Sequence, residues 1–392
     1  MRSTFSCITL FALVVLAIAR GNTATAGEQA GPSLKQGDAV ILGGRSAVVT
    51  RLDTLPYVES DYSKRFKFDS VDNPKLKELR QRYHLEDVVA PGKTEFDRQV
   101  LLLDWVNHKF KKFGKPSSPA KGALDVLAAV DAGNSFFCTQ YGQVMVSAAA
   151  SLGWVDRALA LRRPDNRWHG STEHTSTEIW SNQYRKWVLF DPTFAMYVEK
   201  DGVPLSAYEF RQEWFYHDAN DVTFVQDKDR KRYRKSDMPV LRGSYPGFGD
   251  LTFDPGATDV YAFIGYVPNT DVMDSGLDYG RMFITKDKLC DGTVWHTRTN
   301  PADPAVDPYF PIDQAALSLT ASGKALGVCL KTLTPNFKAF QVRFDGGDWE
   351  PATDTLTWDL HPGNNRMEAK AVNRFGVDGP ISTAEVELKA GR

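Results

Sequence analysis

One cysteine has a local sequence that suits covalent chemistry. Apolar residues follow Cys138 at helical spacing, so we expect Cys138 in the first turn of a helix that ends at Gly153, with Asn134 or Ser135 as its N-cap. Free backbone N–H groups and the positive end of the helix dipole favour a thiolate at such a position. The pattern therefore predicts that Cys138 is a nucleophilic thiol. The alternative, which the cysteine count alone leaves open, is that Cys138, Cys290 and Cys329 are all buried and inert.

A base and an acid lie on a predicted β-hairpin. His174 opens one β-prone run and Asp191 closes the next, just before Pro192, which cannot donate to a strand ladder. A symmetric hairpin would pair Trp180 with Arg185, Glu178 with Trp187 and His174 with Asp191. Directly paired residues have Cβ atoms about 5 Å apart, so the carboxylate would orient the imidazole. A slip of one residue would separate the two side chains onto opposite faces.

These three groups would have distinct roles in acyl transfer through a thioester. Cys138 would attack an amide carbonyl, His174 would take and return the proton, and Asp191 would fix the tautomer and stabilise the imidazolium. We expect the backbone N–H of Cys138 to donate to the oxyanion. A second donor is not assigned; Gln140 and the Trp side chains remain open.

Three short motifs carry a family resemblance: Cys138-Thr139-Gln140-Tyr141 at the start of a helix, His174-x-x-x-Glu178, and Trp187-x-x-x-Asp191-Pro192-Thr193. On these motifs, residues 94–210 resemble the transglutaminase-like superfamily, papain-like enzymes that carry Cys, His and Asp in this chain order. The resemblance implies a papain-like α+β core, with Cys138 as nucleophile, His174 as base and Asp191 as orienting acid.

Two positions depart from the family pattern. Phe136 stands where many members have Gly, and Ser176 stands where many have Trp. Both bear on the shape of the acyl pocket. They keep open a second interpretation, a catalytically inactive transglutaminase-like binding protein of the cell surface.

The sequence predicts neither a metal site nor an organic cofactor. His169 and His174 lie near Glu173 and Glu178, but without the helical His-Glu-x-x-His spacing of a zinc site. We interpret Trp168, Trp180 and Trp187 as core residues or groove walls.

Local patterns divide the chain into segments. Helices are expected at 75–82, 94–110 and 123–130, and strands at 39–42 and 47–52. Six short strands follow at 316–321, 326–330, 340–344, 356–360, 366–373 and 383–388. They predict an all-β sandwich whose architecture resembles an immunoglobulin-like or fibronectin-III-like module. The chain pattern breaks at the Gly-rich residues 243–249 and at the Pro-rich residues 301–311. The expected parts are a signal peptide (1–26), an N-terminal segment (27–90), a transglutaminase-like domain (91–242), a connecting region (243–311) and the sandwich (312–392).

The start of the chain predicts export. Arg2 precedes the apolar residues 8–18, and small residues at 24 and 26 suit a cleavage site. An uncleaved anchor is the alternative, but such a stretch spans only about half a bilayer core. Export to a secreted, periplasmic or cell-surface location would leave three cysteines, of which Cys290 and Cys329 could pair while Cys138 stays free.

Charge and composition narrow the partners. The chain of 392 residues has 47 Lys plus Arg against 49 Asp plus Glu and is 42% hydrophobic, which is typical of globular domains. This balance argues against nucleic acid as the main partner. The basic run 228–235 is either a solvated face or a contact for an anionic polymer. We therefore predict a cysteine hydrolase or acyltransferase acting on peptide or protein amides. Hydrolysis is favoured because water needs no acceptor site, and the sandwich is a candidate for attachment to a cell-surface polymer.

Overall fold

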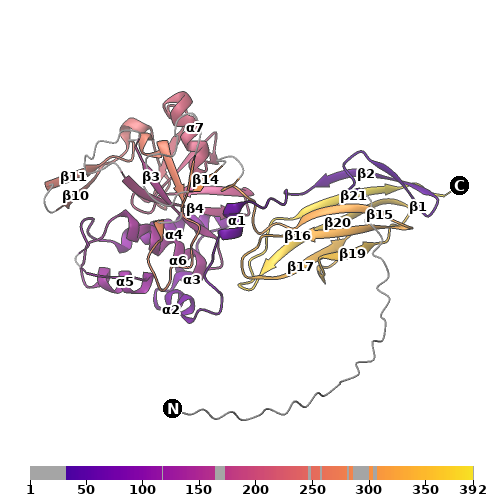
Figure 1. The fold of residues 1–392 in the computed structure, drawn as a ribbon, viewed down its shortest axis with the longest axis horizontal. Coiled ribbons are helices and arrows are strands. Elements are labelled where there is room, and N and C mark those ends of the chain that lie inside the picture. The colour runs from indigo at the N-terminus through magenta and orange to yellow at the C-terminus, as the bar shows by residue number, and fades with distance from the viewer. Residues whose placement is uncertain are drawn as a thin grey trace, which may run out of the picture.

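The computed structural model describes residues 32–116, 118–163, 173–245, 249–256, 258–279, 282–285, 300–302 and 307–391. Across them the chain combines α-helices with mainly antiparallel sheets, which confirms the α+β class. A core of helices and sheets is joined to an elongated β-sandwich (Figure 1). The predicted signal peptide lies outside the described residues. No helix in the described ranges has both the length and the apolarity that crossing a membrane requires.

The core is built on a six-stranded sheet. Its strand order is β14 (Asn300–Ala302), β13 (Phe283–Thr285), β12 (Phe263–Tyr266), β3 (Asp156–Arg162), β4 (Glu173–Ser181) and β5 (Lys186–Phe190). All neighbours are antiparallel except β13 and β14. Residues assigned from sequence to a connecting region therefore supply three core strands. All four residues of β12 are buried, so this strand has no alternating pattern that sequence analysis could detect.

Helices cover both faces of this sheet. One face packs against α2 (Pro74–Arg82), α3 (Leu85–Val89), α4 (Glu95–Lys109), α5 (Ala123–Asp131) and α6 (Cys138–Ser151), and the other against α1 (Asp61–Arg65) and α7 (Ala207–His217). The three predicted helices are confirmed as α2, α4 and α5. Thr94 begins α4 through a reciprocal capping box with Asp97, which satisfies N–H groups at the helix start.

A smaller sheet and a hairpin extend the core. The sheet has the order β7 (Val203–Pro204), β6 (Met196–Lys200), β8 (Thr223–Gln226) and β9 (Lys231–Tyr233). Short 3-10 turns at Lys235–Asp237 and Thr258–Ala262 flank a hairpin of β10 (Leu241–Tyr245) and β11 (Gly249–Phe253). The described residues of the Gly-rich segment, 243–245 and 249, thus lie in paired strands. Several cations of the basic run pair with acids of this chain, including Lys231 with Asp227 at 3.0 Å and Lys235 with Asp218 at 2.6 Å.

The sandwich is assembled from both ends of the described chain. One sheet has the order β15 (Ala316–Ser322), β16 (Ala325–Lys331) and β19 (Thr355–Trp358). The other has the order β1 (Ala39–Leu42), β2 (Arg45–Asp53), β21 (Ser382–Leu388), β20 (Gly363–Asn373), β17 (Phe337–Phe344) and β18 (Glu350–Ala352). The predicted strands are confirmed. The N-terminal pair joins the sandwich because Ala47 and Val49 of β2 bury their side chains in its core.

Candidate active site

Cys138 is the first residue of α6. The N-cap is Phe137, which has an extended backbone (φ −96°). Its side chain makes no capping hydrogen bond to the start of the helix. The predicted caps are wrong: Asn134 donates to the Ala129 carbonyl at 2.9 Å, and the Ser135 hydroxyl donates to the Lys115 carbonyl at 2.8 Å. The first N–H groups of α6 therefore have no side-chain cap beside the thiol, which leaves the positive helix end to act on the sulfur.

The predicted end of α6 is confirmed. Leu152 caps the helix, and Gly153 follows in the left-handed region at φ +82°. The N–H of Trp154 donates to the Ala149 carbonyl at 3.0 Å, which closes the last turn.

The hairpin of β4 and β5 has a different register from the predicted one. Trp180 pairs with Trp187 and Glu178 pairs with Leu189, a shift of two residues. Arg185 belongs to the turn, where its φ of +54° takes it out of the ladder. Because side chains alternate with a period of two, this shift keeps His174 and Asp191 on one face, in diagonal positions.

The imidazole and the carboxylate are hydrogen-bonded. His174 Nε2 lies 2.6 Å from Asp191 Oδ2. The Asp191 side chain is only 1% exposed, and its Oδ1 accepts from the backbone N–H of Thr193 at 3.0 Å. Asn107 of α4 holds the same turn by donating to the Pro192 and Thr193 carbonyls at 3.1 and 2.8 Å. The Asp191 carboxylate is thus held in place by its own turn as well as by its contact with the imidazole.

The remaining ring nitrogen, Nδ1, is left for the thiol. Burial raises the pKa of Cys138, but a hydrogen bond and the positive charge of His174, with the N–H of Thr175, lower it overall. Burial lowers the pKa of His174, but the charge and hydrogen bond of Asp191 and the contact with Cys138 raise it to about 10. Both shifts favour a thiolate–imidazolium pair. Cys138 as a whole residue is half-buried.

Close contact between α6 and β4 brings the thiol to this pair. Gly142 lies one turn after Cys138, and a Cβ on it would be 2.9 Å from Thr175 Cγ2. Thr175 follows His174 directly and donates its N–H to the Cys138 sulfur. The absent side chain at Gly142 is therefore what lets the strand approach the helix start.

We expect Gly142→Ala to slow alkylation of Cys138 by about tenfold. Inside a helix, alanine is more favourable than glycine by about 1 kcal/mol. Overpacking of the new methyl group against Thr175 typically costs about 1–3 kcal/mol and would move β4 away from the Cys138 sulfur. Rates of iodoacetamide labelling and urea unfolding measure the two effects. Adding Thr175→Ser removes the clashing methyl and should restore labelling; no rescue would contradict this role for Gly142.

Tyr279 reaches the same place from a distant segment. Its hydroxyl lies 2.9 Å from Thr175 Oγ1, which is 3.4 Å from Thr139 Oγ1. Tyr279 comes from the connection between β12 and β13, and no sequence motif marked it.

Comparison with known proteins gives this chain no family. No family model matches it, and no curated protein matches it. Functional inference therefore depends on the chemistry of its own residues.

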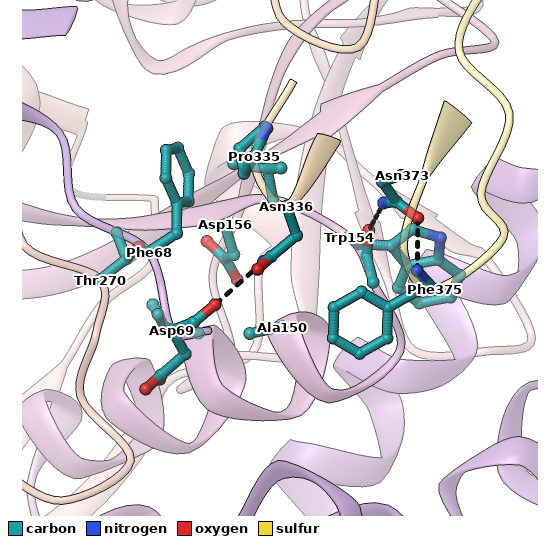
Figure 2. Close-up of a pocket in the computed structure, with 13 residues that line it drawn as sticks. Phe68, Asp69, Ala150, Trp154, Asp156, Thr270, Pro335, Asn336, Asn373 and Phe375 are labelled. Carbon is teal, nitrogen blue, oxygen red and sulfur yellow. Dashed lines mark hydrogen bonds between the residues drawn. The ribbon is translucent and has the colours of Figure 1, made fainter. Parts of the chain in front are cut away.

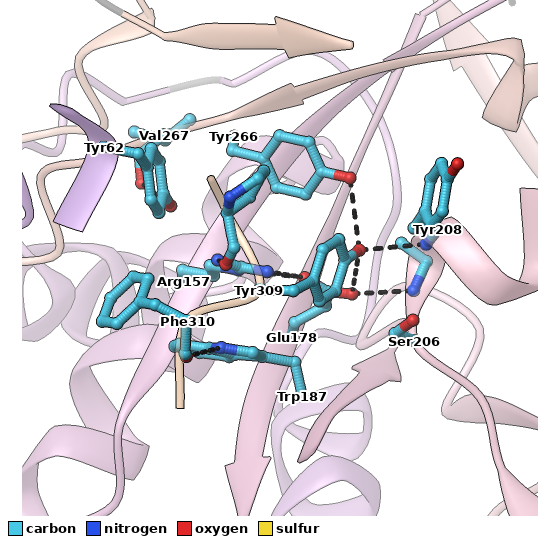
Figure 3. A network of polar contacts seen from close by, with 12 residues as sticks. Tyr62, Arg157, Glu178, Trp187, Ser206, Tyr208, Tyr266, Val267, Tyr309 and Phe310 are labelled. Carbon is cyan, nitrogen blue, oxygen red and sulfur yellow. Dashed lines mark hydrogen bonds and ion pairs between the residues drawn. The ribbon is translucent and has the colours of Figure 1, made fainter. Parts of the chain in front are cut away.

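Glu178, part of the His174 motif, lies in a buried ion pair next to the site. The Arg157 and Glu178 side chains are both 0% exposed, and Arg157 Nε and Nη2 lie 2.9 and 2.7 Å from Glu178 Oε2. Glu178 Oε1 accepts from the Ala207 N–H at 2.7 Å and from the Tyr309 hydroxyl at 2.9 Å (Figure 3). The Arg157 guanidinium lies 4.0 Å from the ring centroid of Trp187. This network joins β3, β4 and the start of α7. Glu178 therefore fixes the relative positions of the elements around the candidate site.

Several other expectations have simple outcomes. Trp180 and Trp187 are buried, at 3% and 1% exposure, and belong to the core. Trp168 and His169 lie outside the described residues. Cys329 carries a free thiol, and its expected partner Cys290 also lies outside the described part.

Proposed function

We propose that this protein is an exported, thiol-dependent enzyme with a papain-like, transglutaminase-like core that acts on peptide or protein amides. The observation that carries the proposal is the imidazole of His174, held by Asp191 at 2.6 Å and hydrogen-bonded to the thiol at the start of α6. Such an arrangement of nucleophile, base and orienting acid suits acyl transfer.

The reaction would proceed in two halves. The Cys138 thiolate adds to the amide carbonyl carbon, and the carbonyl electron pair moves to oxygen, where the Cys138 N–H can donate. Collapse breaks the C–N bond, and the leaving amine takes the proton of the His174 imidazolium. A water then gives its proton to His174 and attacks the thioester, and Cys138 leaves as thiolate. If an amine replaced this water, the same steps would form a cross-link.

The proposal predicts the pH dependence of thiol reactivity. In protein without the predicted signal peptide (1–26) and carrying Cys290→Ser and Cys329→Ser, Cys138 is the remaining thiol. Its iodoacetamide labelling from about pH 4 to about pH 9 should reach half its maximal rate below about 8.5. His174→Ala should move this half-point upward, since burial alone raises the pKa of Cys138. A half-point near 8.5 that His174→Ala leaves in place would favour the inactive binding protein.

The acyl acceptor needs a separate assay. Incubating the protein with an unfolded protein and a labelled primary amine distinguishes the outcomes. The first half-reaction releases a new amino terminus or ammonia in either case, so this release without incorporated label indicates hydrolysis, and incorporated label indicates amine transfer. We expect hydrolysis to dominate. Cys138→Ala is the control and should abolish both signals.

A further inference from the structure

A small cavity of about 20 Å³ lies where the core meets the sandwich. The core side is lined by Ala150, Asp156 and Thr270, and the sandwich side by Asn336, Asn373 and Phe375 (Figure 2). This end of α6 is opposite to the one that carries Cys138. A volume of this size is room for about one water molecule.

The surrounding contact between core and sandwich is polar. Asn373 donates to the Gly153 carbonyl at 3.0 Å, and Asn336 donates to the Asp69 carbonyl at 3.0 Å. Arg374 pairs with Asp72 at 2.6 Å. Polar interfaces between domains of one chain permit relative motion, so the charge state of buried groups can affect docking.

Asp156 is a buried carboxyl at this cavity. It is 2% exposed, and neither carboxyl oxygen has a partner at hydrogen-bond geometry. The side chain points toward Asn336, next to the Asp69 carbonyl and the C-terminal turn of α6 (Figure 2). Carbonyl oxygens and the negative end of a helix dipole disfavour a carboxylate, whereas a neutral carboxyl could donate to them.

The charged groups around Asp156 do not offset its burial. Burial raises the pKa of Asp156 well above its usual range, and the negative charge of Glu178 adds to this. The N–H and the charge of Arg157, which is bound to Glu178, and the Thr177 hydroxyl lower this pKa by less than burial raises it. The other charged side chains around this interface are Asp69, whose pKa burial raises to about 6, Asp271, the Asp72–Arg374, Asp274–Lys75 and Asp378–Lys370 ion pairs, and Arg80, which donates to the Ser151 carbonyl at the end of α6 at 3.3 Å. The last two turns of α6 carry no charged side chain.

A second carboxyl occupies the segment that enters the sandwich. Asp313 is 4% exposed, and its Oδ1 has no hydrogen-bond partner. It faces Glu95 of α4 and Asn182 of the turn between β4 and β5. Burial, with the negative charge of Glu95, raises the pKa of Asp313 to about 7.

We propose that docking of the sandwich on the core is coupled to protonation, with Asp156 and Asp313 held as neutral carboxyls in the docked state. Undocking would expose both groups to water, where a carboxyl loses its proton near pH 4. Docking is therefore strongest in acid. For each carboxyl, the docking constant falls about tenfold per pH unit between the pKa of the exposed group and that of the docked group, and is constant outside this interval.

The test is small-angle X-ray scattering of the full chain from about pH 5 to about pH 9, with circular dichroism to confirm that secondary structure persists. We expect the radius of gyration of the wild type to increase with pH. Asp156→Asn combined with Asp313→Asn, which cannot ionise, should stay compact throughout. Asp72→Asn removes an exposed charge from the same interface and should keep the dependence on pH.

Two outcomes would overturn the proposal: a wild-type radius that does not change with pH, or an increase that persists in the double variant. If the double variant does not fold, each single variant should lose about half of the dependence. Equal dependence in the wild type and both single variants would also be decisive against it. None of these measurements involves Cys138, so their result is independent of the proposed enzyme activity.

Discussion

Asp191→Asn is expected to lower kcat for amide cleavage by about 10⁴-fold, the largest change that we predict. An asparagine can hold the backbone N–H of Thr193 as the carboxylate does, but it brings no negative charge to His174 Nε2, 2.6 Å away. The asparagine side-chain NH₂ can instead donate to Nε2, which then carries no proton. The ring proton moves to Nδ1, the nitrogen that must accept the proton of the nucleophile. Loss of the correct tautomer and of imidazolium stabilisation has this magnitude in related triads.

The measurement combines steady-state kinetics with thiol labelling. Since Asp191 raises the pKa of His174 to about 10, its replacement should lower that pKa and weaken the ion pair with Cys138. Labelling by iodoacetamide at pH 6 should therefore slow in Asp191→Asn. Asp221→Asn, an exposed carboxyl beyond α7, is the matched control and should behave as wild type. Activity of Asp191→Asn within about tenfold of wild type would contradict the proposed role.

Glu178→Gln is expected to destabilise the protein by about 3–5 kcal/mol, the usual cost of leaving one partner of a buried ion pair alone. Arg157 has 0% exposure and lies against the Trp187 ring, so water cannot replace the lost carboxylate. The Ala207 N–H and the Tyr309 hydroxyl would also meet a weaker acceptor. Urea unfolding followed by Trp fluorescence measures the loss.

Two comparisons separate burial from charge. Glu78→Gln removes the exposed partner of Arg82 and should change stability by less than about 1 kcal/mol. Arg157→Met combined with Glu178→Leu removes both charges and should recover part of the stability lost in Glu178→Gln. If Glu178→Gln and Glu78→Gln had equal effects, the ion pair would not fix the relative positions of the elements around the candidate site.

Local sequence was sufficient for the elements that carry the three candidate residues. The apolar spacing after Cys138 and the glycine at 153 predicted α6, because a helix depends on neighbours three and four residues apart. The β-prone runs around the turn near residue 183 predicted β4 and β5. The predicted proximity of His174 and Asp191 survived the wrong register, since a shift of two residues changes the pairing but not the face.

The register, the helix cap and every long-range partner were decided only by the tertiary structure. Arg185 adopted a left-handed turn conformation, and Asn134 and Ser135 bonded to other carbonyls, choices that depend on surrounding packing. Gly142, Tyr279 and Arg157 act on residues far away in sequence, and β2 pairs with a strand at the opposite end of the chain. A periodic pattern records which side of an element is buried, but not which distant segment buries it, because many segments can satisfy the same apolar face.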